Sequence, residues 1–241
     1  MNSPTEKHWV PLDSRERRVL GVLVEKAKTT PEYYPLTIAA LVTGCNQKSN
    51  RDPVTNFDAD DVEEILQGLR KKGAVVMVEA GGRVVRWKHT LYDWLKVTKV
   101  ELAVIAELLL RGSQTEGDLR ARASRMEPLA DLPALQSVLE SLVAKDLVVY
   151  LSPPGVRRGV VVTHNLYPAN ELQRERSRQA ELPSVEEEPD RPARTSPSRV
   201  EHAIGVPPAE LAQLRADLEA LRDQVRALTD EVKELKSALG A

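Results

Sequence analysis

The chain has 241 residues, of which 41% are hydrophobic and only 4% are aromatic, so its cores must be built mainly from Leu and Val. The formal net charge of −2 excludes the global basic excess that many nucleic-acid-binding proteins carry. A single cysteine excludes an internal disulfide, and no apolar run approaches the roughly 18 residues that a membrane-spanning helix needs. We therefore expect a cytoplasmic protein that does not enter a membrane.

The first expected helix lies within residues 12–26, LDSRERRVLGVLVEK, and it has a counterpart at 97–111, VTKVELAVIAELLLR. Each begins with a capping-box pattern, D-x-x-E or T-x-x-E, in which two side chains satisfy early backbone N–H groups. In both segments apolar residues at i, i+1, i+4 and i+5 form one apolar stripe. This match predicts a tandem duplication.

Three further segments follow each of these helices in the same order. They are a short helix at 36–44 and 115–124, a third helix at 62–69 and 135–142, and a Val-rich stretch at 74–92 and 147–167. Each Val-rich stretch is expected to form two strands around a turn, and it ends in a related tetrapeptide, HTLY or HNLY. His89 and His164 open these tetrapeptides, so we expect them to share a structural role.

One copy therefore reads helix, helix, helix, two-stranded hairpin, which is the winged-helix arrangement. An isolated hairpin is only marginally stable, so each hairpin must pack against its helices. The sequence predicts a mostly α protein with small β wings, of the α+β class. Residues 12–92 and 97–167 are expected to form two tandem winged-helix domains.

The polar stretch 45–53, CNQKSNRDP, lies between the second and third helices of the first copy. A phosphate-binding loop needs glycines that this stretch lacks and a strand before it. Cys45 has no histidine near it in sequence that could serve as a base, and one cysteine with four scattered histidines gives no zinc-ligand spacing. We therefore expect no enzymatic activity, no cofactor and no metal, and we expect Cys45 to be buried.

The same stretch is either a binding surface or a loop that bonds to itself. Its candidate contact residues are Asn46, Gln47, Lys48, Ser49, Asn50 and Arg51. The amides and the hydroxyl can donate and accept hydrogen bonds, and the two cations can contact phosphate. Alternatively, the Asn and Asp side chains bond to the backbone of the loop itself. The sequence leaves both interpretations open.

Further cations lie in the expected hairpins and around the second helix of the second copy. The candidate contact residues among them are Arg83, Arg86, Arg120, Arg122, Arg125, Arg157 and Arg158. Several cations on one face would give salt-sensitive binding to DNA phosphates. The third helices are less suited to DNA, because the first begins with carboxylates that repel phosphate. The second is expected to expose a nearly neutral set, Gln136, Ser137, Glu140 and Ser141.

Two long segments resemble the YceH-like family of bacterial proteins. They are EKAKTTPEYYPLTIAALVTGCNQKSNRDPV in the first copy and LLLRGSQTEGDLRARASRM in the second. The similarity extends over roughly residues 12–170. The resemblance implies tandem winged-helix domains in a cytosolic bacterial protein, and it implies no particular biochemical activity.

The C-terminal part has a different character. Residues 171–209 are polar and rich in proline, so we expect a disordered linker. In residues 210–239, Leu and Val alternate spacings of three and four, with opposite charges at the flanking positions. This pattern predicts a parallel two-stranded coiled coil. The alternative is a lone amphipathic helix that docks on the body of the protein.

These features favour, by a narrow margin, a dimeric tandem winged-helix protein that binds double-stranded DNA and regulates transcription. Self-association through residues 210–239 would deliver two copies through long linkers and supply avidity. The alternative is a protein–protein adaptor that uses the winged-helix scaffold without binding DNA directly. The acidic start of the first copy's third helix and the near-neutral charge support this second interpretation. An apolar or acidic concave patch on the surface would favour the adaptor, and a continuous basic stripe would favour DNA binding.

Overall fold

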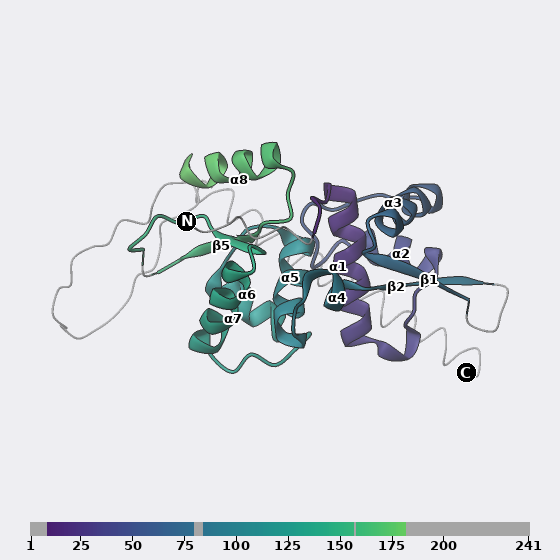
Figure 1. Cartoon of the computed structure of the whole chain (residues 1–241), viewed down its shortest axis with the longest axis horizontal. Helices are drawn as coiled ribbons and strands as arrows, with labels where there is room; N and C mark the ends of the chain where they lie inside the picture. The colour runs from purple at the N-terminus through teal and green to yellow at the C-terminus, as the bar shows by residue number, and fades with distance from the viewer. Residues whose placement is uncertain (1–8, 80–83, 157, 182–241) are drawn as a thin grey trace, which may run out of the picture. The chain divides into compact units, whose positions relative to one another are not determined.

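The computed structural model describes residues 9–79, 84–156 and 158–181 (Figure 1). Within these residues the chain forms α-helices and two small antiparallel sheets, which is the α+β class expected from the sequence. None of the described helices is both long and apolar enough to cross a membrane. The expected coiled coil at 210–239, and the expected linker from residue 182 onward, lie outside the described residues.

The first copy contains three helices and a hairpin, with two short helical segments between and after them. Its elements are α1 Ser14–Thr29, η1 Pro31–Tyr33, α2 Ile38–Cys45, α3 Ala59–Lys71, β1 Val75–Glu79, β2 Val85–His89 and α4 Leu91–Leu95. Strands β1 and β2 pair antiparallel. An isolated bridge between Leu36 and Trp87 joins the segment before α2 to this hairpin. The helix α4 was not expected, since the sequence pattern ended the hairpin segment at residue 92.

The second copy has the same order of helices and hairpin. Its elements are α5 Lys99–Arg111, β3 Gln114–Thr115, α6 Glu116–Ala123, α7 Leu132–Ala144, β4 Val148–Tyr150, β5 Val161–His164 and α8 Ala169–Glu181. Strand β5 lies between β3 and β4 in a three-stranded antiparallel sheet. The short strand β3 therefore holds the hairpin in the second copy as the Leu36–Trp87 bridge does in the first.

Side-chain caps explain where the long helices begin. The Asp13 carboxylate accepts a hydrogen bond from the Glu16 N–H at 2.8 Å, and the Glu16 carboxylate accepts one from the Asp13 N–H at 2.9 Å. A capping box of the same kind begins α5, and a third one begins α3. Each box satisfies backbone donors that have no partner within the helix. The two boxes expected at the first helices are confirmed.

His89 and His164 have the same role at the ends of the two hairpins. The Nδ1 atom of His89 accepts a hydrogen bond from the Leu91 N–H at 3.3 Å, and that of His164 accepts one from the Leu166 N–H at 3.2 Å. Burial, and to a smaller extent the charges of nearby lysines, lowers the pKa of His89 to about 4. Burial also lowers the pKa of His164 well below its usual value. Both rings are therefore neutral acceptors that fix the turn after the hairpin, and the expected shared role is confirmed.

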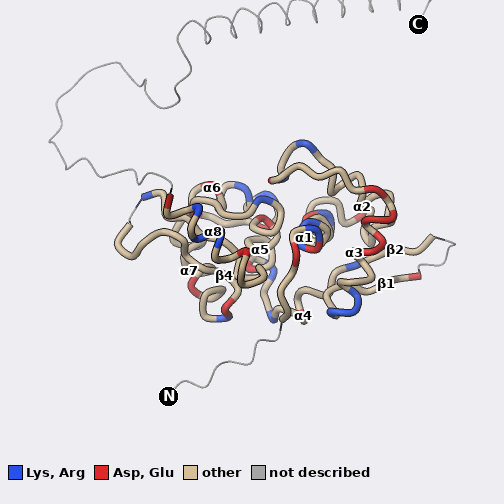
Figure 2. The backbone as a smooth tube through the Cα atoms, turned by 90° about the horizontal axis from the view of Figure 1, so that it is seen from above, with Lys and Arg blue, Asp and Glu red and all other residues tan. Residues whose placement is uncertain are grey.

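The two copies are joined through their first helices. Helices α1 and α5 lie side by side (Figure 1 and Figure 2). A Cβ atom placed on Gly21 of α1 would lie 2.8 Å from the Cγ and Cδ2 atoms of Leu110 in α5. Glycine therefore permits the close approach of the two helices, and the buried Leu and Val residues of both copies form one continuous core.

Residues 171–181 differ from the expected disordered linker, because they belong to helix α8. Polar contacts hold this helix to the body of the protein. Glu171 forms an ion pair with Arg17 of α1 at 2.7 Å, and Glu175 accepts a hydrogen bond from the Ser113 hydroxyl at 2.8 Å. None of the residues of α8 is fully buried, so the segment has no apolar stripe that the sequence pattern could detect.

Candidate functional site

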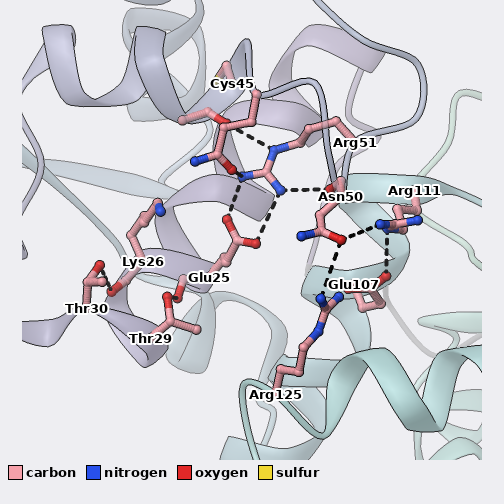
Figure 3. Close-up of polar contacts among 12 residues, drawn as sticks. Glu25, Lys26, Thr29, Thr30, Cys45, Asn50, Arg51, Glu107, Arg111 and Arg125 are labelled. Carbon is pink, nitrogen blue, oxygen red and sulfur yellow. Dashed lines mark hydrogen bonds and ion pairs between the residues drawn. The ribbon is translucent and has the colours of Figure 1, made fainter. Parts of the chain in front are cut away.

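The polar loop after α2 is held by an inward-pointing arginine, Arg51, which is only 6% exposed. Its guanidinium forms an ion pair with Glu25 of α1, with Nη2 and Oε2 2.5 Å apart (Figure 3). The Nε atom donates to the backbone oxygen of Gly44 at 3.0 Å, and Nη2 also donates to the Gln47 side chain at 2.9 Å. The candidate contacts Gln47 and Arg51 are thus engaged with other groups of the protein.

Asn46 closes the same loop at its other end. Its side chain donates to the backbone oxygen of Phe57 at 2.7 Å and accepts from the Phe57 N–H at 2.8 Å. The Thr55 hydroxyl lies 3.2 Å from the same amide oxygen. Cys45 beside it is buried, as expected, and burial raises the pKa of its thiol to about 12. These contacts favour the interpretation of residues 45–53 as a loop that bonds to itself.

Asn50 connects the loop to the second copy. It has a φ of 60°, a left-handed conformation that asparagine adopts more readily than most residues. Its side-chain oxygen accepts hydrogen bonds from Arg111 at 2.5 Å and from Arg125 at 3.4 Å (Figure 3). The backbone N–H of Asp52 donates to the Leu110 oxygen at 3.0 Å. The loop of the first copy is therefore a junction between the two copies.

Three of the candidate arginines are half-buried and bonded within the protein. Arg86 on β2 donates to the Pro35 backbone oxygen at 2.9 Å. Arg120 on α6 lies 3.4 and 3.5 Å from backbone oxygens that follow the helix, and Arg122 donates to the Gln114 side chain at 2.7 Å. These guanidinium groups stabilise the local backbone, and a ligand would have to compete for them.

The remaining candidate residues are exposed or lie outside the described residues. Lys48, Ser49, Arg125 and Arg158 are exposed. Lys48 and Ser49 precede Asn50, which contacts Arg125, so the structure brings these residues to one edge of the junction. Arg158 lies in the connection between β4 and β5, whereas Arg86 lies on β2 of the other sheet. Figure 2 shows basic and acidic segments interspersed along the described backbone. The candidates Arg83 and Arg157 lie outside the described residues.

The third helices present little positive charge at their first turns. Helix α3 begins with exposed carboxylates, and Arg15 of α1 pairs with Asp61 at 2.6 Å and with Glu64 at 3.3 Å. Helix α7 exposes Gln136, Ser137 and Glu140, as expected. Ser141 differs from the expectation, because it is half-buried and its hydroxyl donates to Glu101 of α5 at 2.6 Å.

A groove lies between α7 and the β4–β5 hairpin, and we call it the α7–hairpin groove. It encloses about 560 Å³. Its lining residues are Glu116, Gln136, Tyr150, Ser152, Pro153, Pro154, Gly155, Val156 and Val160. Most of these residues come from the hairpin turn, and the sequence pattern had marked this segment only as a turn. The Pro-Pro-Gly sequence and the valines that follow it are the sequence feature from which an apolar surface at this turn could have been predicted.

The α7–hairpin groove combines apolar side chains with a buried carboxylate. Tyr150 and Val156 are 40% and 41% exposed, so both present apolar surface to the groove. Glu116 is buried, and its carboxylate accepts a hydrogen bond from Gln136 at 3.0 Å. Partial burial, followed by the charge of Glu116, raises the pKa of the Tyr150 hydroxyl, which therefore stays protonated as a hydrogen-bond donor. The groove can hold an apolar side chain beside a cationic group.

The fold and these surfaces define an α+β protein with two helix–helix–helix–hairpin copies joined by a polar junction. Among the described residues no group of His, Cys, Asp and Glu side chains could hold a metal ion. The family model described as "Protein of unknown function, DUF480" matches residues 12–155, and the chain belongs to this family. The family relationship expected from the sequence is confirmed.

Curated relatives with the name UPF0502 protein are similar to the same part of the chain. The protein from Rhodopirellula baltica is 50% identical over 161 residues, which cover 67% of this chain and 67% of the relative. That from Geotalea daltonii is 53% identical over 136 residues, 56% of this chain and 62% of the relative. That from Koribacter versatilis is 41% identical over 162 residues. The chain thus spans about two thirds of the length of these first relatives.

Proposed function

We propose that the chain is a tandem winged-helix protein that acts as an adaptor and binds a protein partner in the α7–hairpin groove. The order of helices and hairpin in both copies supports the winged-helix assignment. The single observation that carries the adaptor function is the groove itself, whose lining combines apolar side chains with one buried carboxylate, Glu116. It lies beside the third helix of the second copy, which exposes no cation within Leu132–Ala144.

The chemistry of the groove specifies the partner. Tyr150 and Val156 can bury an apolar side chain, while Glu116 and Glu140 lie close enough to Tyr150 for their charges to act on its hydroxyl. A Lys or Arg of the partner would find its countercharge there. The ligand is therefore a protein segment that carries an apolar side chain next to a Lys or Arg.

Binding to double-stranded DNA is the second candidate function. The observation that favours it is the junction edge, where exposed Arg125 donates to Asn50 and exposed Lys48 lies two residues before Asn50. Neutralisation of two phosphates would make the slope of log affinity against log salt concentration steeper by only about 2. So small a slope corresponds to weak binding. Fluorescence anisotropy with mixed-sequence duplex tests this function. Salt-sensitive binding that is lost in a Lys48→Gln/Arg125→Gln variant would support it.

The rest of the proposal follows from the sequence. We propose a cytoplasmic protein without enzymatic activity, in which residues 210–239 pair two copies as a parallel coiled coil. Pairing would place two α7–hairpin grooves in one assembly, so a partner with two matching segments would bind with increased avidity.

Selection from a displayed peptide library on the full-length protein tests the adaptor function. We expect enrichment of peptides that place an apolar residue next to Lys or Arg, and we expect Tyr150→Ala to abolish this enrichment. Tyr92→Ala is the matched control, because Tyr92 of α4 is 39% exposed and lies outside the groove. The proposal fails if no sequence class is enriched, or if Tyr150→Ala retains the selected peptides.

A further inference from the structure

Arg18 of α1 is a buried cation that lacks a full set of partners. It is 3% exposed, and its Nη2 atom donates to the Pro53 backbone oxygen at 2.5 Å. Its Nε and Nη1 atoms have no hydrogen-bond partner among the described residues. Burial, followed by the charge of Arg51, lowers the pKa of Arg18 to about 10, so the group remains charged at neutral pH. A buried charge without a counterion is costly, and most proteins pair it.

Arg18 lies in the wall of a cavity of about 260 Å³. Residues from α1, the loop after α2, α5 and α8 line this cavity, which we call the junction cavity. Its charged lining residues are Arg17, Arg18, Arg111, Arg174, Arg178, Asp52, Glu171 and Glu175. Five arginines therefore face three carboxylates. The lining of the junction cavity has a formal excess of positive charge, although Glu107, which lies outside the lining, pairs with Arg111 at 3.3 Å.

Two of the three carboxylates are already paired. Glu171 forms its ion pair with Arg17 at 2.7 Å, and Glu175 pairs with Arg178 at 3.2 Å. The third carboxylate, Asp52, and Glu25 of α1 act on Arg18 through their charges, but neither forms an ion pair with Arg18 among the described residues. An anion in the junction cavity would supply the missing countercharge in a region where water screens charges less than at the surface.

We propose that the junction cavity is a binding site for a small molecule that carries a phosphate group. Guanidinium groups match the oxygens of phosphate through paired hydrogen bonds. The volume of about 260 Å³ lies just below the usual range for ligand cavities, about 300–1,000 Å³, so the ligand is a small phosphorylated compound. A duplex cannot bring a backbone phosphate to a buried guanidinium, so a free small molecule is the fitting source. The site contacts both copies and α8, and it is separate from the α7–hairpin groove.

Isothermal titration calorimetry of the full-length protein with inorganic phosphate and pyrophosphate, at constant ionic strength, tests this proposal. We expect saturable binding to one site. Arg18→Met and Arg174→Gln should each weaken binding about tenfold or more, since each removes a charge that a phosphate would contact or offset. Arg176→Gln is the matched control, because Arg176 is exposed on the same helix and does not line the cavity.

The unliganded stability of Arg18→Met gives a second readout. Methionine fills a similar space without an unpaired charge, so we expect the variant to unfold at a higher temperature than the native protein when no anion is present. If this variant does not fold, the exposed Arg174→Gln variant still tests the site. Absence of saturable heat, or equal weakening by Arg176→Gln, would overturn the proposal. Tyr150→Ala should bind pyrophosphate normally, which separates this site from the adaptor function.

Discussion

Arg51 and Glu25 form an ion pair in which the arginine side chain has no exposed surface and the glutamate side chain keeps 18%. The guanidinium also donates to backbone oxygens of Gly44 and Asn50 at 3.0 and 2.8 Å. Compared with apolar residues of similar size, such a buried pair adds little stability. Removal of one partner is different, because it leaves a charge in a medium that solvates it poorly.

Replacement of Glu25 by Gln should therefore destabilise the protein by about 3 kcal/mol, at the lower end of the cost of breaking a buried pair. Urea-induced unfolding followed by circular dichroism measures this change. Glu63→Gln on the exposed face of α3 is the control, and it should stay within about 0.5 kcal/mol of the native protein. A Glu25→Gln protein as stable as the control would show that Arg51 does not depend on this carboxylate.

The roles of these residues could be predicted from the sequence only in part. Composition indicated correctly that residues 45–53 are polar and that Cys45 is buried. The choice between a binding surface and a self-bonded loop depended on hydrogen-bond partners that are far from this stretch in the sequence. Arg51 meets Glu25, which lies 26 positions away, and Asn50 meets Arg111, which lies 61 positions away. Local sequence patterns carry no information on such pairs, because the packing of α1 on α2 and on α5 brings them together.

At the scale of elements, the contact between α1 and α5 sets the geometry of the molecule. Gly21 faces Leu110, which is 1% exposed and belongs to the core. Gly44 in α2 is similar, since an added Cβ would lie 2.6 Å from the Cγ1 atom of Val22. In both places a missing side chain lets two helices approach more closely than a larger residue would allow.

Gly21→Ala should destabilise the protein by about 1–3 kcal/mol, because the new methyl group overpacks the α1–α5 contact. Gly68→Ala in α3 is the matched control. Its Cβ would meet only Glu16 at 3.6 Å, so the gain in helix propensity should leave stability unchanged or raise it by up to about 1 kcal/mol. Thermal unfolding compares the two variants. Equal changes in stability at both positions would contradict the close packing. Support would come from a double variant, if Leu110→Ala destabilises the Gly21→Ala protein less than it destabilises the native protein.

The elements that the sequence predicted best are those with strong local signals. Capping boxes and apolar stripes located α1 and α5, and Val-rich stretches around turn residues located the hairpins. Helix α8 was not predicted, because it has no apolar stripe and polar side chains hold it to the body through Arg17 and Ser113. The α7–hairpin groove and the junction cavity could not be predicted either, since both arise where elements distant in sequence meet.

At the scale of the whole molecule, several polar contacts reinforce the α1–α5 contact between the two copies. Lys28 of α1 forms an ion pair with Glu127 after α6 at 2.8 Å. The Leu12 N–H donates to the Leu166 oxygen at 2.8 Å, which ties the start of the first copy to the end of the second. Such links fix the position of the second hairpin relative to the first copy. We infer that a partner in the α7–hairpin groove meets a rigid surface, which reduces the entropic cost of binding.

Site-specific photo-crosslinking in the native host cell tests most directly whether this groove binds a protein. A benzophenone amino acid is placed at position 150 in the groove or at position 92, where Tyr92 has nearly the same exposure, 39% against 40%. Binding in the groove predicts that the probe at position 150 captures one discrete protein after irradiation, and that the probe at position 92 does not. Equal capture from both positions, or capture only of nucleic acid from position 150, would contradict it.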